Sequence, residues 1–277
     1  MADFRKEDYD LELCACGNTG SVPGGRINLT RVRERLDALE EAGDTEGAVR
    51  LLDYWLEEAR EIRDRVGETL IENEYVGLYR KAGRGEESLR HGERALSLLE
   101  EYGLENTVMA GTTRINVATA CTAFDRPERG MALFEDAREI YEGALAPDDG
   151  RLGGLYNNMG LCAAGLGRFA EGRKLYEQAL QAVARTRDGE GEAAMTCLNL
   201  ADLVSAEAEG REDEDALIQA AEETERLVEK AWMLLNTPSL PHDSYYRFIC
   251  DKCAPVMAHY GRLDYAEELE KRAKEGL

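Results

Sequence analysis

Residues 155–180 read LYNNMGLCAAGLGRFAEGRKLYEQAL, in which a glycine-arginine turn separates two helix-like stretches. The turn dipeptide recurs along the chain at a constant spacing of 42 residues. Its three copies are Gly83-Arg84, Asp125-Arg126 and Gly167-Arg168. Each copy ends one helix-like segment and precedes another. Self-similarity at a period of about 20 to 50 residues is typical of repeat architectures.

A shift of 42 residues superposes further positions of matching size or chemistry. They are Ala95, Ala137 and Ala179 in one set, and Glu74, Asn116 and Asn158 in another. The repeating unit is therefore a pair of helices. The sequence predicts an all-α fold, an α-α superhelix (solenoid) of about six antiparallel helix pairs, in which each unit contacts its neighbours.

The chain divides into an N-terminal irregular segment, residues 1–27, and a repeat region, residues 28–277. Turn-forming residues from Cys14 to Gly25 predict a loop, and Asn28 or Thr30 can cap the first helix. Six turns are expected within helix pairs, at Gly43-Asp44, Gly83-Arg84, Asp125-Arg126, Gly167-Arg168, near Gly210 and at Gly261-Arg262. The last helix, from Leu263 to Glu275, is expected to act as a polar cap on the array.

The quoted stretch resembles the tetratricopeptide repeat. The positions that carry the family's alternation of bulky, small and aromatic residues are Tyr156, Met159, Gly160, Gly167, Gly172, Tyr176 and Ala179. Three other units depart from the pattern at Trp55, Glu72, Gly92 and Arg114. The period of 42 is similar to the longer repeat of kinesin light chains, and the whole chain is similar to bacterial tetratricopeptide-repeat proteins of unassigned function.

We call the leading helix of each pair its first helix. Asparagines occupy matching places in the first helices of successive pairs, at Asn116, Asn158 and Asn199, with Asn157 and Asn73 nearby. In the resembled family, first helices line a concave groove where asparagines hold the backbone of an extended peptide. An amide side chain both donates and accepts hydrogen bonds, so it suits that role, but it can equally bridge adjacent helices. The remaining residues expected on this groove are Glu74, Thr112, Thr119, Leu161, Met195 and Asp202.

Composition limits the classes of partner. The 277 residues carry a net charge of −22, which disfavours binding to nucleic acid or to anionic membranes. The charged start MADFRKEDYDLEL lacks the apolar core of a signal peptide, and no apolar stretch approaches the length of a membrane span. We therefore expect a cytoplasmic protein whose partner is a protein or peptide segment.

The cysteines suggest an alternative function. The spacing Cys250-x-x-Cys253 is one used by metal ligands, Cys14 and Cys16 offer two more thiols, and His242 and His259 flank the pair. The repeat register instead places Cys250, Cys253 and Cys197 at apolar core positions, where free cysteine packs as a small hydrophobe. We therefore expect that the protein binds no metal and no cofactor. The alternative is a metal-binding or redox protein that uses the Cys250 and Cys253 pair.

No sequence motif for a catalytic nucleophile, phosphate loop or zinc protease is present, which predicts that the protein is not an enzyme. The leading hypothesis is a scaffold that binds a protein or peptide in its groove. A receptor for a short signalling peptide is an alternative, as is a scaffold whose flanks make the contacts.

Overall fold

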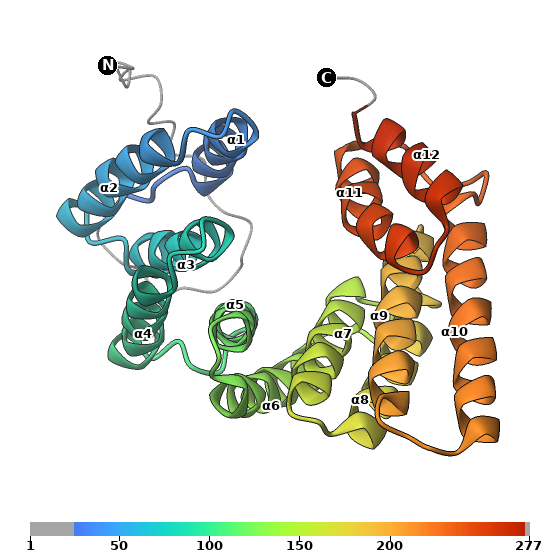
Figure 1. The fold of residues 1–277 in the computed structure, drawn as a ribbon. Helices are drawn as coiled ribbons and strands as arrows, with labels where there is room; N and C mark the ends of the chain where they lie inside the picture. The colour runs from blue at the N-terminus through green and yellow to red at the C-terminus, as the bar shows by residue number, and fades with distance from the viewer. Residues whose placement is uncertain (1–24, 275–277) are drawn as a thin grey trace. The chain divides into compact units, whose positions relative to one another are not determined.

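The computed structural model describes residues 25–274, which form twelve α-helices and no strand (Figure 1). The helices are α1 Leu29–Glu41, α2 Thr45–Glu61, α3 Arg65–Lys81, α4 Gly85–Tyr102, α5 Val108–Ala123, α6 Pro127–Ala144, α7 Gly150–Gly165, α8 Phe169–Val183, α9 Glu190–Ala208, α10 Glu214–Leu235, α11 Ser244–His259 and α12 Leu263–Lys274. They form six successive pairs. The predicted all-α repeat fold is confirmed.

The chain divides into two compact units, and the boundary between them falls between Ala137 and Arg138 of α6. In the first unit, α3 packs against α2, α4 and α5. In the second unit, α9 packs against α7, α8, α10 and α11, and α12 packs against α11. Helices α3 and α9, each the first of its pair, therefore contact their own second helix and a neighbouring pair, as the repeat predicts.

The predicted turns are confirmed by backbone conformation. Gly43, Gly83, Gly167, Gly210 and Gly261 all have φ between 69° and 77°, a left-handed conformation that glycine adopts without steric cost. Asp125 takes the same conformation, with φ of 57°, at the place where its repeat lacks the glycine. Aspartate tolerates this region better than most residues, so the turn is kept.

The start of the first helix also follows the sequence. Asn28 caps α1, because its side-chain oxygen accepts a hydrogen bond of 3.1 Å from the backbone N–H of Arg31. Asp64 caps α3 in the same way and also accepts a bond of 2.9 Å from the N–H of Ile27. That second bond ties the segment before α1 to the start of α3.

The departures from the repeat pattern in the first unit have physical explanations. Trp55, where a small residue is usual, is 3% exposed and belongs to the core of α1, α2 and α3. Gly92 lets α4 approach α5 closely, since a Cβ there would lie 3.1 Å from the methyl groups of Val117. The Arg114 guanidinium donates to the carbonyl of Glu105 at 2.9 Å and lies 4.0 Å from the Asp136 carboxylate, so it is paired within its own unit.

The small and aromatic positions of the repeat meet in the second unit. A Cβ on Gly160 would lie 2.6 Å from the ring of Tyr176, so only a hydrogen at that position lets α7 and α8 approach this closely. Gly172 plays the same part on α8, where a Cβ would lie 2.6 Å from Leu203 of α9. Close helix packing of this kind explains why the period and the small residues coincide.

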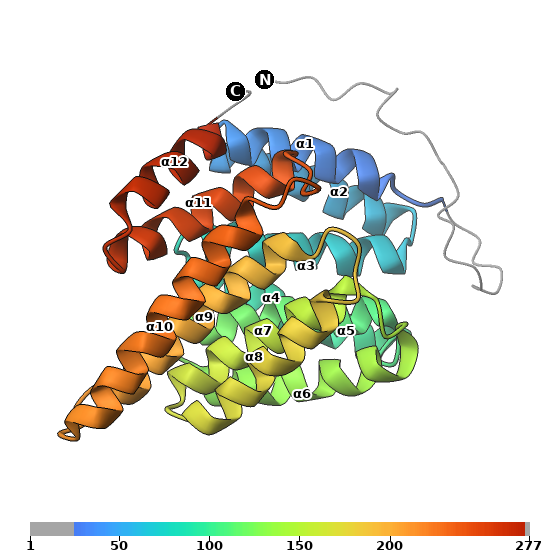
Figure 2. The same ribbon diagram turned by 90° about the vertical axis from the view of Figure 1, so that its right-hand side faces the viewer.

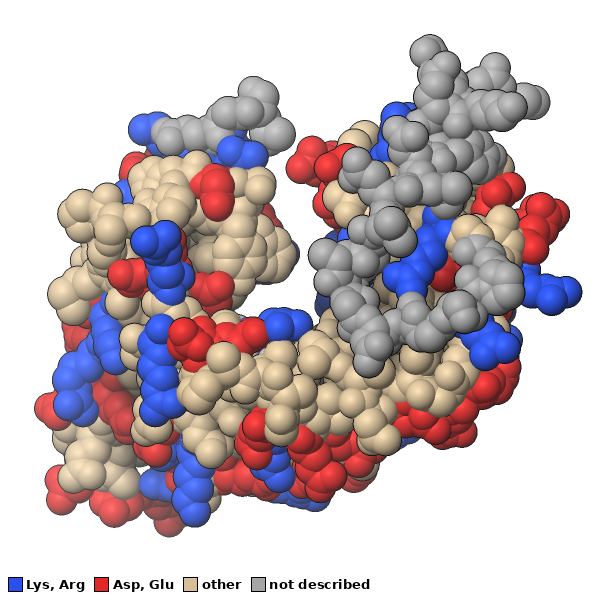
Figure 3. All heavy atoms as spheres, turned by 180° about the vertical axis from the view of Figure 1, so that it is seen from behind, with Lys and Arg blue, Asp and Glu red and all other residues tan. Residues whose placement is uncertain are grey.

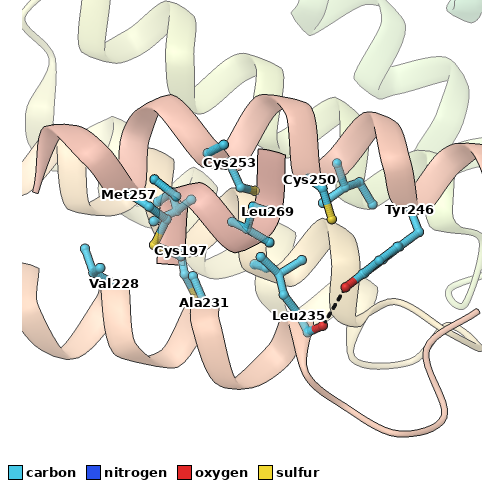
Figure 4. Close-up of a cluster of buried hydrophobic side chains, with 14 of the residues drawn as sticks. Cys197, Val228, Ala231, Leu235, Tyr246, Cys250, Cys253, Met257 and Leu269 are labelled. Atoms are coloured by element: carbon cyan, nitrogen blue, oxygen red, sulfur yellow. Dashed lines mark hydrogen bonds between the residues drawn. The ribbon is translucent and has the colours of Figure 1, made fainter. Parts of the chain in front are cut away.

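The last two pairs share a buried cluster that contains sulfur (Figure 4). Its members include Cys197 from α9, Val228 and Ala231 from α10, and Cys253 from α11. The hydroxyl of Tyr246 on α11 donates a bond of 3.0 Å to the carbonyl of Leu235, which holds the end of α10 against α11. Helix α11 continues through Pro255 to His259.

Candidate peptide-binding face

The asparagines of the first unit bridge two successive first helices. Asn116 on α5 donates from Nδ2 to Oδ1 of Asn73 on α3, at 3.1 Å. Asn73 is 4% exposed, whereas Asn116 is half-buried. The bond uses one N–H of Asn116 and one lone pair of Asn73, and it leaves the second N–H and the carbonyl oxygen of Asn116 with capacity for a ligand.

The other residues predicted in this unit lie on the same two helices. Glu74 accepts a bond of 2.7 Å from Arg33 of α1. The hydroxyls of Thr112 and Thr119 donate to carbonyls one turn earlier in α5, at 3.1 and 2.8 Å. A threonine that donates within its own helix can still accept a hydrogen bond from outside.

The second unit repeats the arrangement. Asn199 on α9 donates from Nδ2 to Oδ1 of Asn157 on α7, at 3.0 Å. The adjacent Asn158 is half-buried, and Leu161, one turn further along α7, is 43% exposed. Met195 is partly buried against the core of the last two pairs. Helix bridging therefore accounts for one bond in each pair, while contact with a peptide remains a prediction.

A cavity of about 430 Å³ lies between α9 and α11, near the bonded pair Asn157 and Asn199. Asp202 and Ala206 line it from α9, and Pro255 and His259 line it from α11. The Tyr260 hydroxyl donates to Asp202 at 2.7 Å. Burial and the Asp202 carboxylate raise the pKa of Tyr260 to about 12, although a hydrogen bond with Ser205 lowers it in part. The hydroxyl therefore stays protonated at neutral pH.

Sequence reasoning missed an exposed stripe on α11. Phe248 is 49% exposed and Tyr245 is 48% exposed, and the ammonium of Lys252 lies 5.4 Å from the Phe248 ring centroid. If Cys250 matches Tyr156 in the repeat, then Lys252 matches Asn158 and Pro255 matches Leu161. Extending the register to the sixth pair therefore finds Lys252 and Pro255, whereas Phe248 and Tyr245 match Gly154 and Arg151, and the repeat gives no signal for these two aromatic residues.

A network of charged residues lies between α2, α3 and α4 in the first unit, with its two glutamates buried and Arg60 half-exposed. Arg60 donates to Glu68 and to Glu72, both at 3.0 Å, and Nδ1 of His91 lies 2.6 Å from the other oxygen of Glu72. Burial raises the pKa of Glu68, but hydrogen bonds from Tyr102 and Arg60 and the nearby arginine charges outweigh it and lower that pKa overall. The network explains why a carboxylate replaces the usual apolar residue at Glu72.

The cysteine pair on α11 points into the core (Figure 4). Cys250 and Cys253 are at most 1% exposed, and burial raises the pKa of Cys253 to about 12. Among residues 25–274, no three His, Cys, Asp or Glu side chains are placed to hold a metal ion. Cys14 and Cys16 lie outside the described residues. The predicted core position of the pair is confirmed.

Residues 65–143 match the family model described as tetratricopeptide repeat. These residues are tetratricopeptide repeats. They comprise α3 to α5 and most of α6, and the helix pairs on either side repeat the same hairpin. No curated protein matches the sequence at a significant level.

Solved structures show the same fold over three quarters of the chain. BtubC (BKLC) from P. vanneervenii is similar with a TM-score of 0.64 and 22% identity, and the match covers 74% of this chain and 79% of that one. The nearly identical TPR-like repeats assigned to a kinesin light chain of Podosopora anserina match with a TM-score of 0.59 and 16% identity, covering 74% and 94%. The likeness to kinesin light chain repeats is thereby confirmed at the level of fold.

Surface charge and helix length also bear on partners. Acidic and basic side chains are interspersed on the face shown in Figure 3. Within the described ranges, every helix is too short or too polar to serve as a membrane span.

Proposed function

We propose that the protein is a binding scaffold rather than an enzyme, and that it holds a protein or peptide segment on the exposed side of its first helices. We call this side the first-helix face. In the N-terminal unit it comprises Glu74, Thr112, Asn116 and Thr119, together with Asn73, which is buried and bonds to Asn116. In the C-terminal unit it comprises Asn157, Asn158, Leu161, Met195, Asn199 and Asp202.

The observation that carries the proposal is the repeated amide pair. Asn73 with Asn116, and Asn157 with Asn199, form the same Nδ2 to Oδ1 bond between successive first helices. The bond fixes the orientation of each amide before a ligand arrives, which reduces the entropy lost on binding. A peptide backbone presents alternating N–H and C=O groups that the remaining amide atoms can pair with.

Amide contacts alone give modest affinity, since each contributes only about 1 kcal/mol net. The exposed apolar side chains supply the rest. Leu161 lies on α7 beside the amide pair, and Phe248 lies on α11. Burying apolar surface contributes about 25 cal/mol per Å², so one anchored side chain of a ligand is worth several amide bonds. We therefore expect a ligand with an extended backbone and at least one apolar anchor.

A selection from random 12-residue peptides displayed on phage tests the proposal with the full chain as bait. Selected peptides should bind the double variant Asn157→Ala/Asn199→Ala at least about tenfold more weakly than the unchanged chain, a loss of about 1.4 kcal/mol. The matched control is Asn106→Ala, an exposed asparagine between α4 and α5. Equal binding to all three proteins would contradict the role given to the first-helix face.

A further inference from the structure

The hairpin of α9 and α10 is longer than the pairs before it. Helix α10 has 22 residues and α9 has 19, whereas α7 and α8 have 16 and 15. The turn positions Gly210 and Gly261 are 51 residues apart instead of 42. The extra residues carry the end of the hairpin, residues 205–228, past α11 and α12 (Figure 2). We call residues 205–228 the hairpin tip.

A cavity of about 580 Å³ opens where the hairpin tip leaves the packed helices. It lies between the end of α9, the first half of α10 and the turn between α11 and α12. Its apolar lining comes from Ala208, Leu217, Ala220, Ala221 and Val228. Leu217 is 39% exposed, so apolar surface continues out of the cavity. A volume in this range is ordinary for a binding pocket and is large enough to take a bulky apolar side chain.

The polar groups around the cavity leave it negative. Arg262 lines the cavity, but its Nη2 lies 2.7 Å from Glu225 and 2.9 Å from Glu229, so its charge is already matched. Ser205 and Thr224 bond to one another at 3.4 Å. Glu209 lines the cavity and makes no side-chain ion pair or hydrogen bond within residues 25–274.

The same negative sign extends over the whole hairpin tip. Residues 205–228 contain nine acidic and two basic residues, a net charge of −7 out of −22 for the chain. Asp213 caps α10, and Glu214 and Asp215 lie in its first turn, where acidic side chains interact favourably with the positive end of the helix dipole. These acids therefore also stabilise the helix. Glu209 and Glu222 lie outside that first turn.

We propose that the hairpin tip is a docking site for a basic peptide segment of a partner protein, with one large apolar side chain that enters the cavity. Lysines or arginines on either side of that side chain meet Glu209 and the neighbouring carboxylates. Charge complementarity favours association and selects against acidic partners. The site is separate from the amide pairs of the first-helix face, so the two surfaces can be tested independently.

The test measures fluorescence anisotropy of labelled nonapeptides on the full chain at about 0.15 M salt, where only charges within a Debye length of about 8 Å act strongly. The first probe has a central phenylalanine, an alanine on each side of it and three lysines at each end. The second replaces the phenylalanine by alanine, and the third replaces every lysine by glutamate. The chain variant is Ala221→Arg, which fills and charges the cavity, and the matched control is Gln219→Arg, an exposed position on α10 that does not line it.

The lysine peptide with phenylalanine should bind at least tenfold tighter than its alanine counterpart, and the glutamate peptide should not bind. Ala221→Arg should weaken binding at least tenfold, and Gln219→Arg by no more than about threefold, which is the effect of added charge alone. Equal binding of the two lysine peptides, or equal effects of the two arginine substitutions, would reduce the site to non-specific charge attraction and overturn the proposal. Loss of binding in Asn157→Ala/Asn199→Ala, or no binding of the first probe, would overturn it too.

Discussion

Two glycines on α7 should respond in opposite ways to the same substitution. At Gly154, an added Cβ would have no heavy atom within 4 Å, and alanine is favoured over glycine in a helix interior by about 1 kcal/mol. We expect Gly154→Ala to stabilise the protein by about 0.5–1 kcal/mol. At Gly160 the same gain is opposed by a contact of 2.6 Å with the Tyr176 ring, which is fully buried and cannot swing away.

Forcing one extra methyl group into a packed core costs about 1–3 kcal/mol. Because helix propensity is common to both sites, the difference in unfolding free energy between Gly160→Ala and Gly154→Ala isolates that cost. Urea unfolding followed by circular dichroism gives it from the midpoints, provided that the slopes agree. Adding Tyr176→Leu should recover part of the loss at Gly160, with a coupling above about 0.5 kcal/mol. If Gly160→Ala proved as stabilising as Gly154→Ala, the close α7–α8 packing would be wrong.

Three further predictions concern buried polar groups. The Tyr176 hydroxyl is buried without a hydrogen-bond partner, so Tyr176→Phe should raise the unfolding free energy by up to about 1 kcal/mol. Tyr75→Phe removes a 2.6 Å bond to Asp53 and should lower the unfolding free energy by about 1–2 kcal/mol. Urea midpoints distinguish the two variants, and equal losses of stability would contradict the claim that only the Tyr75 hydroxyl is hydrogen-bonded. Folding lowers the pKa of Glu68 below its usual 4.5, so its carboxylate contributes stability above about pH 4.5 that is lost as the pH falls through the folded pKa. The difference in unfolding free energy between the unchanged chain and Glu68→Gln should therefore shrink in acid. A difference that grew below pH 4.5 would contradict the lowered pKa. A variant with serine in place of both cysteines of the N-terminal segment should show less than one thiol reactive to Ellman's reagent when native and five when denatured, and rapid native reaction of several thiols would contradict their burial.

The turns and core positions of the fold could be predicted because local chemistry determines them. Gly83 and Gly167 end their helices in a conformation that favours glycine, and Cys250 and Cys253 follow the apolar register. The partners of buried charged residues could not be predicted. Glu72 departs from the repeat pattern, and its role depends on Arg60 from α2 and His91 from α4, which sequence periodicity does not connect.

The candidate site shows the same limit. The in-register asparagines predicted that the first helices of successive pairs place their amide side chains next to one another. Both peptide binding and helix bridging require that arrangement. Which residues bond could not be predicted, because Asn116 donates to Asn73 and not to Glu74, its match 42 residues earlier in the repeat. The cavity at the hairpin tip was also beyond prediction, since it depends on how far an extended hairpin projects past the pair that follows it.

Photo-crosslinking tests the role of the first-helix face most directly. Benzoylphenylalanine is placed either at position 161 on α7, where Leu161 is 43% exposed, or at position 178 on α8, where Gln178 is exposed on a second helix. Each protein is irradiated with a peptide from the phage selection. The account predicts a crosslinked product from position 161 and none from position 178. Crosslinking from position 178 with none from position 161 would contradict it.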